Sequence, residues 1–124
     1  MDDLYHQTIL DHNKYPKNWG KLKGSGVLSS AETNSSCGDK IEVSIKLLGQ
    51  IIDDIKFTGE GCAISIAATS MLTQHIKDEK LNIKNLDEIS IQDIEKMLGI
   101  GPNPAREKCL TIGLHTIKQT LKLT

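Results

Sequence analysis

The sequence has 124 residues and a formal net charge of -1, which together exclude several classes of protein. A chain of this length can bury one hydrophobic core but not two, so a single domain spanning residues 1–124 is expected. Hydrophobic residues make up 38% and charged residues 25% of the chain, close to the globular norm, which argues against wholesale disorder. Because the net charge provides no basic field, we expect no nucleic acid partner.

The N-terminus and the cysteine count point to the cytoplasm. The opening MDDLYHQ shows neither the cationic start nor the apolar segment of a secretory signal. The longest run of low polarity, CAISIAATSML, is too short and too rich in Ser and Thr to span a bilayer, so no membrane association is expected. In a reducing compartment the 3 cysteines would not form a disulfide framework, which leaves metal binding, thiol chemistry or burial.

The first half of the chain predicts a short helix followed by two or three antiparallel strands. An amphipathic helix is expected from Asp2 to about Asn13, because apolar residues recur at helical spacing up to the tyrosine before the first proline. An irregular first strand falls within residues 26–34. Apolar and polar residues alternate over 41–47, which predicts a strand with one buried and one wet face, and 51–58 returns as its hairpin partner.

The second half predicts three helices. The apolar period changes to about 3.6 from Ala63 to about Lys77, which predicts a helix with an apolar stripe of Ile64, Ala68, Met71, Leu72, His75 and Ile76. A second helix is expected over 90–98 with Ser90 as its N-cap. The last helix is expected to begin with Asn103 as N-cap and Pro104 at the first helical position. Its apolar stripe comprises Leu110, Leu114, Ile117 and Leu121. These elements predict an α+β fold: a small antiparallel sheet of about three strands with helices packed on one face.

Two of the three cysteines are expected at one end of the predicted hairpin. Cys37 and Asp39 lie in the segment that leads into its first strand, and side chains two apart in extended chain point the same way. Cys62 ends the returning strand at the start of a helix. A hairpin brings its outer ends together, so these three side chains become neighbours.

The third cysteine, Cys109, is expected in the second turn of the last helix. It follows Arg106 by three residues, so both share a helix face, and it borders the apolar stripe, where a side chain can be half exposed. If this helix begins near the loops, Cys37, Asp39, Cys62 and Cys109 converge. Three thiolates and a carboxylate suit tetrahedral zinc, and thiolates also suit iron-sulfur clusters.

The residues alone also allow interpretations in which the cysteines and histidines bind no metal. A single cysteine is more often a small buried hydrophobe than a ligand, Cys109 above all, and the chain contains no CxxC pair. His75 and His115 lie on predicted helices and are expected to be packed or surface residues rather than ligands.

Three segments resemble a known family: TNSSCGDKIEVSIKL, IIDDIKFTGEGCAISIAATSMLTQHIK and PAREKC. They are similar to the U-type iron-sulfur assembly proteins, which include IscU, SufU and the N-terminal domain of NifU. The opening YHQTILDHNKYPKNWG resembles the start of the same family. The motif PAREKC, with Arg106 three residues before the cysteine and Lys108 where the IscU branch has a histidine, looks like the SufU branch. The LPPVK motif of the IscU branch is missing, so no Hsp70-type chaperone partner is expected, and the segment before PAREKC is shorter than is usual in SufU.

The resemblance implies a function and a site. Such a protein accepts persulfide sulfur from a pyridoxal-phosphate cysteine desulfurase, and Cys37 is the expected acceptor. Cys37, Asp39, Cys62 and Cys109 would hold iron, a transient iron-sulfur cluster or Zn²⁺. Arg106 would stabilise an anion or persulfide, or pair with a carboxylate. Apo iron-sulfur acceptor proteins are the expected recipients, and a homodimer is possible.

Three hypotheses follow from the sequence. The first is a cluster assembly scaffold, which is a sulfur acceptor rather than a conventional enzyme. The second is a zinc-dependent sulfurtransferase that relays sulfur without holding a cluster. The third is a module with a structural zinc, against which Asp39 argues because closed structural sites use Cys and His ligands.

Overall fold

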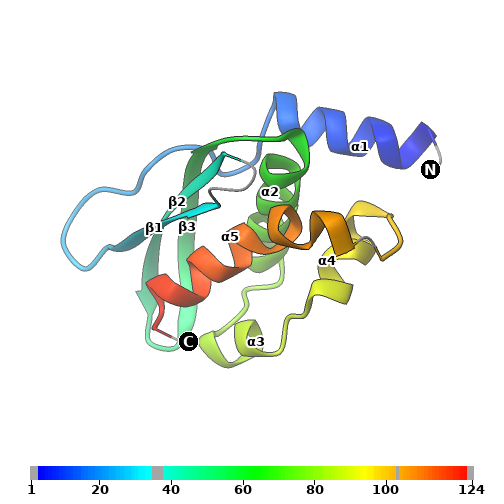
Figure 1. Cartoon of the computed structure of the whole chain (residues 1–124). Coiled ribbons are helices and arrows are strands. Elements are labelled where there is room, and N and C mark those ends of the chain that lie inside the picture. The colour runs from blue at the N-terminus through cyan, green and yellow to red at the C-terminus, as the bar shows by residue number, and fades with distance from the viewer. Residues whose placement is uncertain (1–2, 35–37, 103, 123–124) are drawn as a thin grey trace.

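The computed structural model describes residues 3–34, 38–102 and 104–122. Its elements follow in the order α1 (Asp3–Lys14), β1 (Leu28–Asn34), β2 (Asp39–Leu48), β3 (Ile51–Glu60), α2 (Ala63–Asp78), α3 (Ile83–Asp87), α4 (Ile91–Leu98), the 3-10 turn η1 (Pro104–Arg106) and α5 (Glu107–Thr120) (Figure 1). The predicted α+β class is confirmed.

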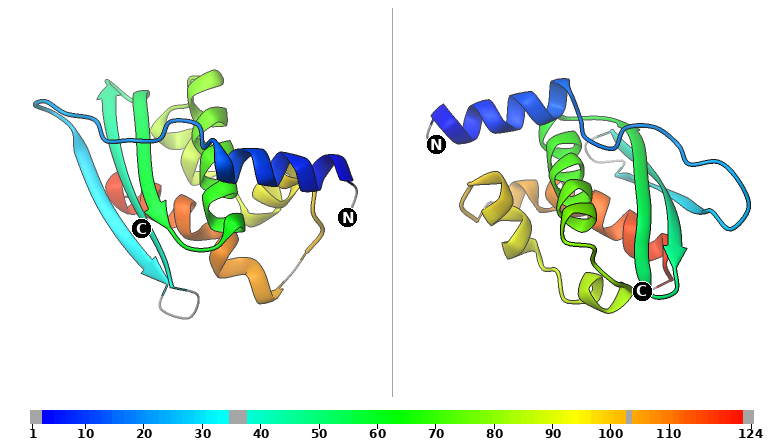
Figure 2. Two further views of the ribbon diagram at one scale, coloured as in Figure 1. Left: turned by 90° about the horizontal axis from the view of Figure 1, so that it is seen from above. Right: turned by 180° about the vertical axis from the view of Figure 1, so that it is seen from behind.

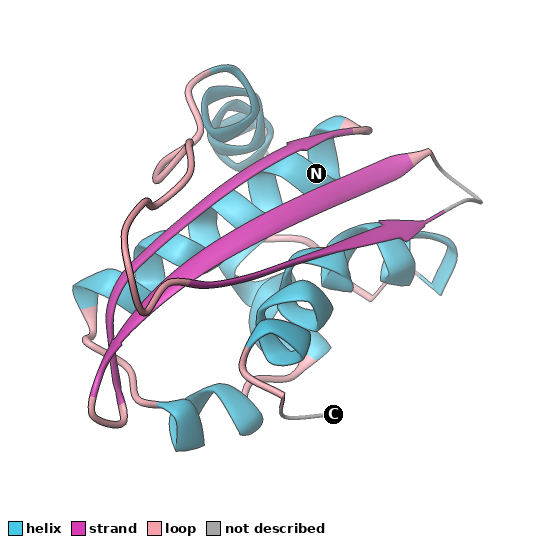
Figure 3. Cartoon of the chain, turned by 90° about the vertical axis from the view of Figure 1, so that its left-hand side faces the viewer, coloured by secondary structure: helices cyan, strands magenta, loops and turns pink. Residues whose placement is uncertain are grey.

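The sheet has three antiparallel strands in the order β1-β2-β3. Apolar side chains of β2 and β3 alternate onto one face, where Ile41, Val43, Ile45, Ile55 and Phe57 are all fully buried. Helices α2 and α5 contact the strands, and the views from above and from the side show the helices gathered on that face (Figures 2 and 3). The core therefore lies between one sheet face and the helical layer, as the alternating pattern predicts.

The opposite face of the sheet is less exposed to solvent than the alternation of apolar and polar residues in β2 predicts. Ser44 was expected on the exposed side, yet its side chain is buried, because the Leu22 backbone N–H donates a 2.9 Å hydrogen bond to its hydroxyl. The segment between α1 and β1 crosses this face, and Lys21 pairs with Glu42 at 2.6 Å. The prediction of a fully wet face is wrong at Ser44, because a loop far away in sequence returns to cover it.

Helix α2 is buried over most of its circumference rather than along a single apolar stripe. The predicted stripe included Ile64, Met71 and His75, which are only half-buried. The buried set is wider and includes polar residues: Ser65, Ile66, Ala67, Ala68, Thr69, Ser70, Leu72, Thr73 and Ile76. Since α1, β3, α4 and α5 all contact this helix, little of its circumference is left for solvent.

The remaining helices partly match the predictions. Ser90 caps α4 through a capping box with Asp93, as expected. Helix α3 was missed, since five residues held by an Asn82 and Asn85 capping box are too few for a periodic pattern. The last helix starts at Glu107 after η1, and the predicted cap Asn103 lies outside the described residues. Among the helices that the structure describes, none is long and apolar enough to cross a membrane.

Candidate metal centre

Three of the four predicted ligands meet at one end of the sheet. Asp39 opens β2, Cys62 immediately precedes α2, and Cys109 lies in the first turn of α5. One ligand atom of each residue lies within 4.8 Å of the corresponding atoms of the other two. Cys37 falls in the segment 35–37, outside the described residues, so a four-ligand site stays a prediction.

The hairpin register brings Asp39 and Cys62 together. Lys40 pairs with Glu60, so the next residues outward, Asp39 and Gly61, face each other across the strand ends. A Cβ atom on Gly61 would collide with the Asp39 carboxylate, and its φ of 139° is unfavourable for other residues. The Cys62 backbone N–H donates a 2.9 Å hydrogen bond to Asp39 Oδ1. A glycine thus lets the backbone approach closely enough to orient the carboxylate.

A close helix crossing brings Cys109 to Cys62. Gly113 of α5 faces Thr69 of α2 so closely that an added Cβ atom would overlap the Thr69 hydroxyl. Cys109 lies one turn before this contact and Cys62 lies before the start of α2. The crossing therefore fixes both cysteines on the same side of the core.

Two expectations for Cys109 are corrected. It lies in the first α-helical turn rather than the second, because η1 replaces the beginning of the predicted helix. It is 4% exposed rather than half exposed. Helix α5 contacts α2, α4 and two strands, so its buried arc is wider than one apolar stripe and includes Cys109.

The site fits a metal ion in burial and donor chemistry. Asp39 is 1% exposed, and among the described residues its Oδ2 atom has no hydrogen-bond partner. A buried carboxylate oxygen without a partner is unfavourable, and a cation would satisfy it. Two cysteine sulfurs complete a donor set that suits Zn²⁺, and thiolates equally suit iron-sulfur clusters. A closed site would need one more ligand beyond these three.

Ser65 lies next to the Cys62 sulfur and was missed at the sequence level. Its hydroxyl oxygen is 3.3 Å from Cys62 Sγ, and its side chain is fully buried. The Thr69 hydroxyl donates to the Ser65 carbonyl oxygen at 2.9 Å. Cys62 is the N-cap of α2 and Ser65 is three residues on, and this capping-box spacing is the signal that could have identified it.

The sequence also singled out Arg106 and two histidines on predicted helices. Arg106 is exposed at the end of η1, and both ion pairs found among the described residues lie elsewhere, so its role stays a prediction. His75 is half-buried and His115 is exposed, and neither belongs to the ligand group.

Comparisons with known proteins agree with the sequence motifs. The family model for the NifU-like N terminal domain matches residues 4–123. The zinc-dependent sulfurtransferase SufU of Bacillus subtilis is 39% identical, with 96% of this chain and 90% of that protein covered. The scaffold protein IscU of Streptococcus pyogenes is 31% identical, with 98% and 85% covered.

A solved structure gives the same result. A putative iron-sulfur cluster assembly scaffold protein for the SUF system from Fervidobacterium islandicum superposes with a TM-score of 0.67 at 29% identity, covering 91% of this chain and 93% of that one. The family match covers nearly the whole chain, including all three cysteines. The chain therefore belongs to the family of NifU-like N-terminal domains, the U-type iron-sulfur assembly proteins that its motifs resemble.

Proposed function

We propose that this chain is an iron-sulfur cluster assembly scaffold. It accepts persulfide sulfur at Cys37 from a pyridoxal-phosphate cysteine desulfurase and holds iron or a transient cluster on Cys37, Asp39, Cys62 and Cys109. The cargo then passes to apo acceptor proteins. A single cytoplasmic domain of residues 1–124 is part of the proposal. The observation that carries it is the convergence of Asp39, Cys62 and Cys109 around a buried carboxylate oxygen that has no partner among the described residues.

The sulfur step balances without an added oxidant. The Cys37 thiolate attacks the outer sulfur of the donor persulfide, and a new bond forms between that sulfur and Cys37 Sγ. The bond between the two donor sulfurs breaks, and the donor cysteine leaves as a thiolate. Arg106 belongs to this proposal as the exposed cation that attracts the anionic persulfide.

Asp39 gives the site a ligand that is easily released. A carboxylate is a hard ligand among soft thiolates, so it binds iron of a cluster more weakly than cysteine does. Its Oδ1 already accepts a hydrogen bond from the Cys62 N–H, which competes with a metal for the same oxygen. A scaffold needs such a labile ligand because it must give its cargo away.

A zinc-dependent sulfurtransferase is the second candidate function. It is favoured by the PAREKC pattern, in which Lys108 stands directly before Cys109. A bound zinc would lower the pKa values of the coordinating thiols and keep them as thiolates. Asp39, Cys62 and Cys109 would hold it in this case too, with Cys37 as the ligand that is freed for sulfur transfer.

One experiment separates the two candidates. The protein is purified without air, its metals are measured, and it is then reconstituted with iron, cysteine and desulfurase. Bound iron and sulfide with charge-transfer absorption support the scaffold. A zinc that resists replacement, together with faster desulfurase turnover, supports the sulfurtransferase.

The role of Cys37 has its own control. The Cys37→Ser variant should carry no desulfurase-dependent persulfide. Persulfide retained on Cys62 or Cys109 in this variant would contradict the assignment of Cys37 as the acceptor in both candidate functions.

A further inference from the structure

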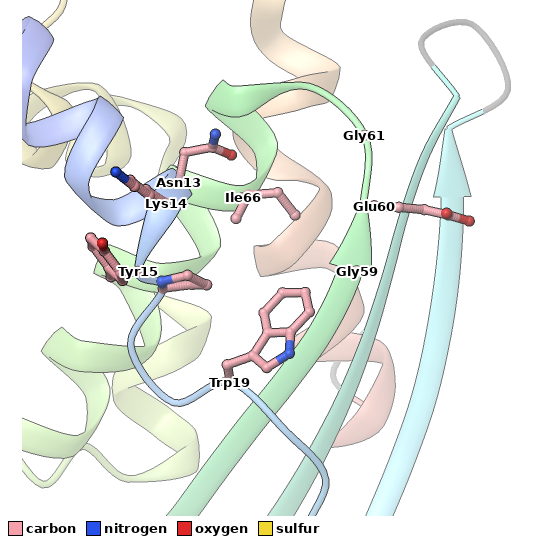
Figure 4. A pocket seen from close by; sticks show the side chains of 9 residues that line it. Asn13, Lys14, Tyr15, Trp19, Gly59, Glu60, Gly61 and Ile66 are labelled. Atoms are coloured by element: carbon pink, nitrogen blue, oxygen red, sulfur yellow. The ribbon is translucent and has the colours of Figure 1, made fainter.

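A pocket of about 700 Å³ lies beside the metal centre, along the outer edge of β3 (Figure 4). We call it the β3 groove, and its principal lining residues are Lys14, Tyr15, Trp19, Gly59, Gly61 and Ile66. Two of these residues connect it to the metal centre. Gly61, the residue after the end of β3, lies against the Asp39 carboxylate, and Gly59 lies two residues earlier, inside β3.

The strand edge in this groove is open. Strand β3 pairs with β2 on one side only. On its other side, the Phe57 N–H donates to the Asn18 carbonyl at 2.9 Å and the Gly20 N–H donates to the Phe57 carbonyl at 2.9 Å. In an antiparallel ladder every second residue turns its N–H and C=O to the same edge, so Gly59 also points outward. Within the described chain, no backbone group pairs with Gly59 on that edge.

The side chains of the groove suit an apolar residue and an acidic one. Trp19 is 46% exposed although its ring packs edge-on against Phe57 at a centroid distance of 5.4 Å. Figure 4 shows the indole and Ile66 between the β3 edge and the end of α1, with Glu60 extending away from the pocket. The exposed Lys14 lies at the rim, with its ammonium 5.4 Å from the Tyr15 ring centre. Lys14 and Glu60 are the two charged lining residues, and because the Glu60 side chain extends away, the Lys14 ammonium is the charge that remains at the rim.

We propose that the β3 groove binds an extended segment of the desulfurase, which pairs with the Gly59 backbone as an added strand. The inference rests on the proposed function and names where the sulfur donor docks. An extended segment advances about 3.3 Å per residue, so a chain that pairs at Gly59 reaches the Gly61 end within two or three residues. A cysteine persulfide carried there arrives beside Asp39 and Cys62. An aliphatic or aromatic side chain of the segment rests on Trp19, and a carboxylate faces Lys14.

The single tryptophan of the chain allows a direct test. The protein is labelled with 5-fluorotryptophan, so its ¹⁹F spectrum reports on Trp19 alone, and unlabelled pyridoxal-phosphate desulfurase is added. We expect the Trp19 resonance to shift on binding and hydrogen exchange of the Gly59 amide to slow by roughly tenfold or more, as for an amide that enters a strand ladder. If sulfur reaches Cys37 while both signals stay unchanged, the groove proposal is overturned and the proposed function stands. If no complex forms and no sulfur is transferred, both are overturned.

Two variants measure how much the groove side chains contribute to desulfurase binding. Trp19→Ala should raise the desulfurase concentration for half-maximal sulfur transfer by roughly tenfold, as for an anchor residue that an interface buries. Lys14→Glu should raise it by roughly threefold or more, because a rim charge that faces a carboxylate is reversed. The matched controls are Leu48→Ala and Lys84→Glu. Leu48 is 68% exposed at the β2–β3 turn, and Lys84 lies in α3, which is hydrogen-bonded to that turn.

The charge variant keeps the test decisive. Trp19→Ala loses the contact with Phe57 and can fail to fold for that reason. Lys14→Glu then still tests the groove, because it changes an exposed side chain. A groove variant that folds and transfers sulfur with the same concentration dependence as its control overturns the proposal.

Discussion

Asp39 contributes one carboxylate oxygen to the fold and leaves the other for the candidate metal site. Its Oδ1 atom orients the site by accepting from the Cys62 N–H, whereas its Oδ2 atom is buried without a hydrogen-bond partner among the described residues. The hydrogen bond to Oδ1 stabilises the strand end. The unpartnered Oδ2 atom makes the metal-free fold less stable. The carboxylate is therefore suited to the metal-bound state rather than to the empty one.

Asp39→Asn separates these two effects, because an amide keeps an oxygen to accept from the Cys62 N–H. We expect the Zn²⁺ affinity to fall by at least about tenfold, since even residues that only support ligands are worth 10–100-fold. The metal-free variant should melt at a higher temperature than the metal-free wild type, because a neutral amide is less unfavourable to bury than a carboxylate. Chelator competition and thermal melts measure both changes.

The control for this variant is Asp53→Asn, at an exposed position of β3. It removes the same charge at a distance from the centre. Equal Zn²⁺ affinities for the two variants would rule out Asp39 as a ligand.

Ser65 contacts the sulfur of a proposed ligand, Cys62. Its buried hydroxyl lies 3.3 Å from Cys62 Sγ and can donate a hydrogen bond to the thiolate. Ser65→Ala preserves the helix, since alanine has the best helix propensity. We expect roughly tenfold weaker Zn²⁺ binding and a shifted sulfur-to-metal charge-transfer band in the Co²⁺-loaded variant.

Ser30→Ala is the matched change for this experiment. Ser30 is a partly buried serine of β1 whose hydroxyl donates to the Thr116 carbonyl at 3.2 Å. Its variant should keep the wild-type spectrum. A Ser65→Ala spectrum identical to wild type would show that the hydroxyl does not contact the sulfur.

At the scale of whole elements, the crossing of α2 and α5 sets the distance between two proposed ligands. The two helices carry or adjoin Cys62 and Cys109, and they touch where Gly113 meets Thr69. Thr69 is a β-branched residue, is fully buried, and donates from its hydroxyl to the Ser65 carbonyl, so it has little freedom to move aside. Any side chain at 113 must push the helices apart.

Gly113→Ala is therefore expected to destabilise the protein. Alanine gains roughly 1 kcal/mol in helix propensity, but inserting a methyl group into a packed interface costs about 1–3 kcal/mol. The free energy of unfolding in urea should fall, and Zn²⁺ affinity should fall with it because Cys109 moves away from Cys62. Gly101→Ala, where the added methyl meets open space and φ is not positive, should change stability by less than about 0.5 kcal/mol. A Gly113→Ala protein more stable than wild type would contradict the close crossing.

A second contact between elements ties the N-terminal helix to α2. His12 Nδ1 lies 2.7 Å from the Ser70 hydroxyl, which also accepts from the Lys17 backbone N–H at 2.7 Å. Because that hydroxyl accepts from Lys17, its own hydrogen can point to His12, which fits a neutral imidazole ring. Burial lowers the pKa of His12, the charge of Lys17 lowers it further, and Asp11 opposes the change. The contact holds the segment that carries Lys14 and Trp19.

This histidine predicts a dependence of stability on pH. Its pKa is lower in the folded than in the unfolded protein, so the unfolded chain binds more protons as the pH falls below about 6.5. The contribution of neutral His12 to the free energy of unfolding is complete above that pH. It is lost as the pH falls toward the pKa of His12 in the folded protein. Urea unfolding at pH 5.5 and 7.5 should show a larger loss on acidification for wild type than for His12→Gln. His115→Gln, at an exposed position, should behave as wild type, and equal losses in all three proteins would contradict the role of His12.

At the scale of the whole molecule, the sequence predicted what depends on local pattern. Alternation over 41–47 and 51–58 located the hairpin, and the hairpin placed Asp39 beside Cys62. The sequence left Cys109 either buried or half exposed at the border of a stripe, because the choice depends on how α5 docks on several elements at once. Ser44 was missed for the same reason, since a returning loop covers it. Long-range packing, which periodicity does not encode, accounts for both errors.

The distribution of the core predicts what metal removal does. Buried apolar residues come from α1, β2, β3 and α2 to α5, and they form one cluster that includes none of Asp39, Cys62 and Cys109, the described residues of the candidate site. Burial of this kind supplies most of the stability of a domain of this size, so the fold should persist without a metal. Chelation is expected to leave the far-ultraviolet circular dichroism and the cooperative unfolding intact.

The stability lost when a chelator removes the metal should follow mass action. At a free Zn²⁺ concentration one hundred times the dissociation constant, the metal adds about 2.7 kcal/mol to the free energy of unfolding, and chelation removes that amount. Thermal melts over a series of Zn²⁺ concentrations measure it, with the Asp39→Asn variant as the protein whose melting temperature depends least on zinc. A chain that loses its helical signal when chelated would instead have a structural zinc, and neither the scaffold nor the sulfurtransferase could then release its site for transfer.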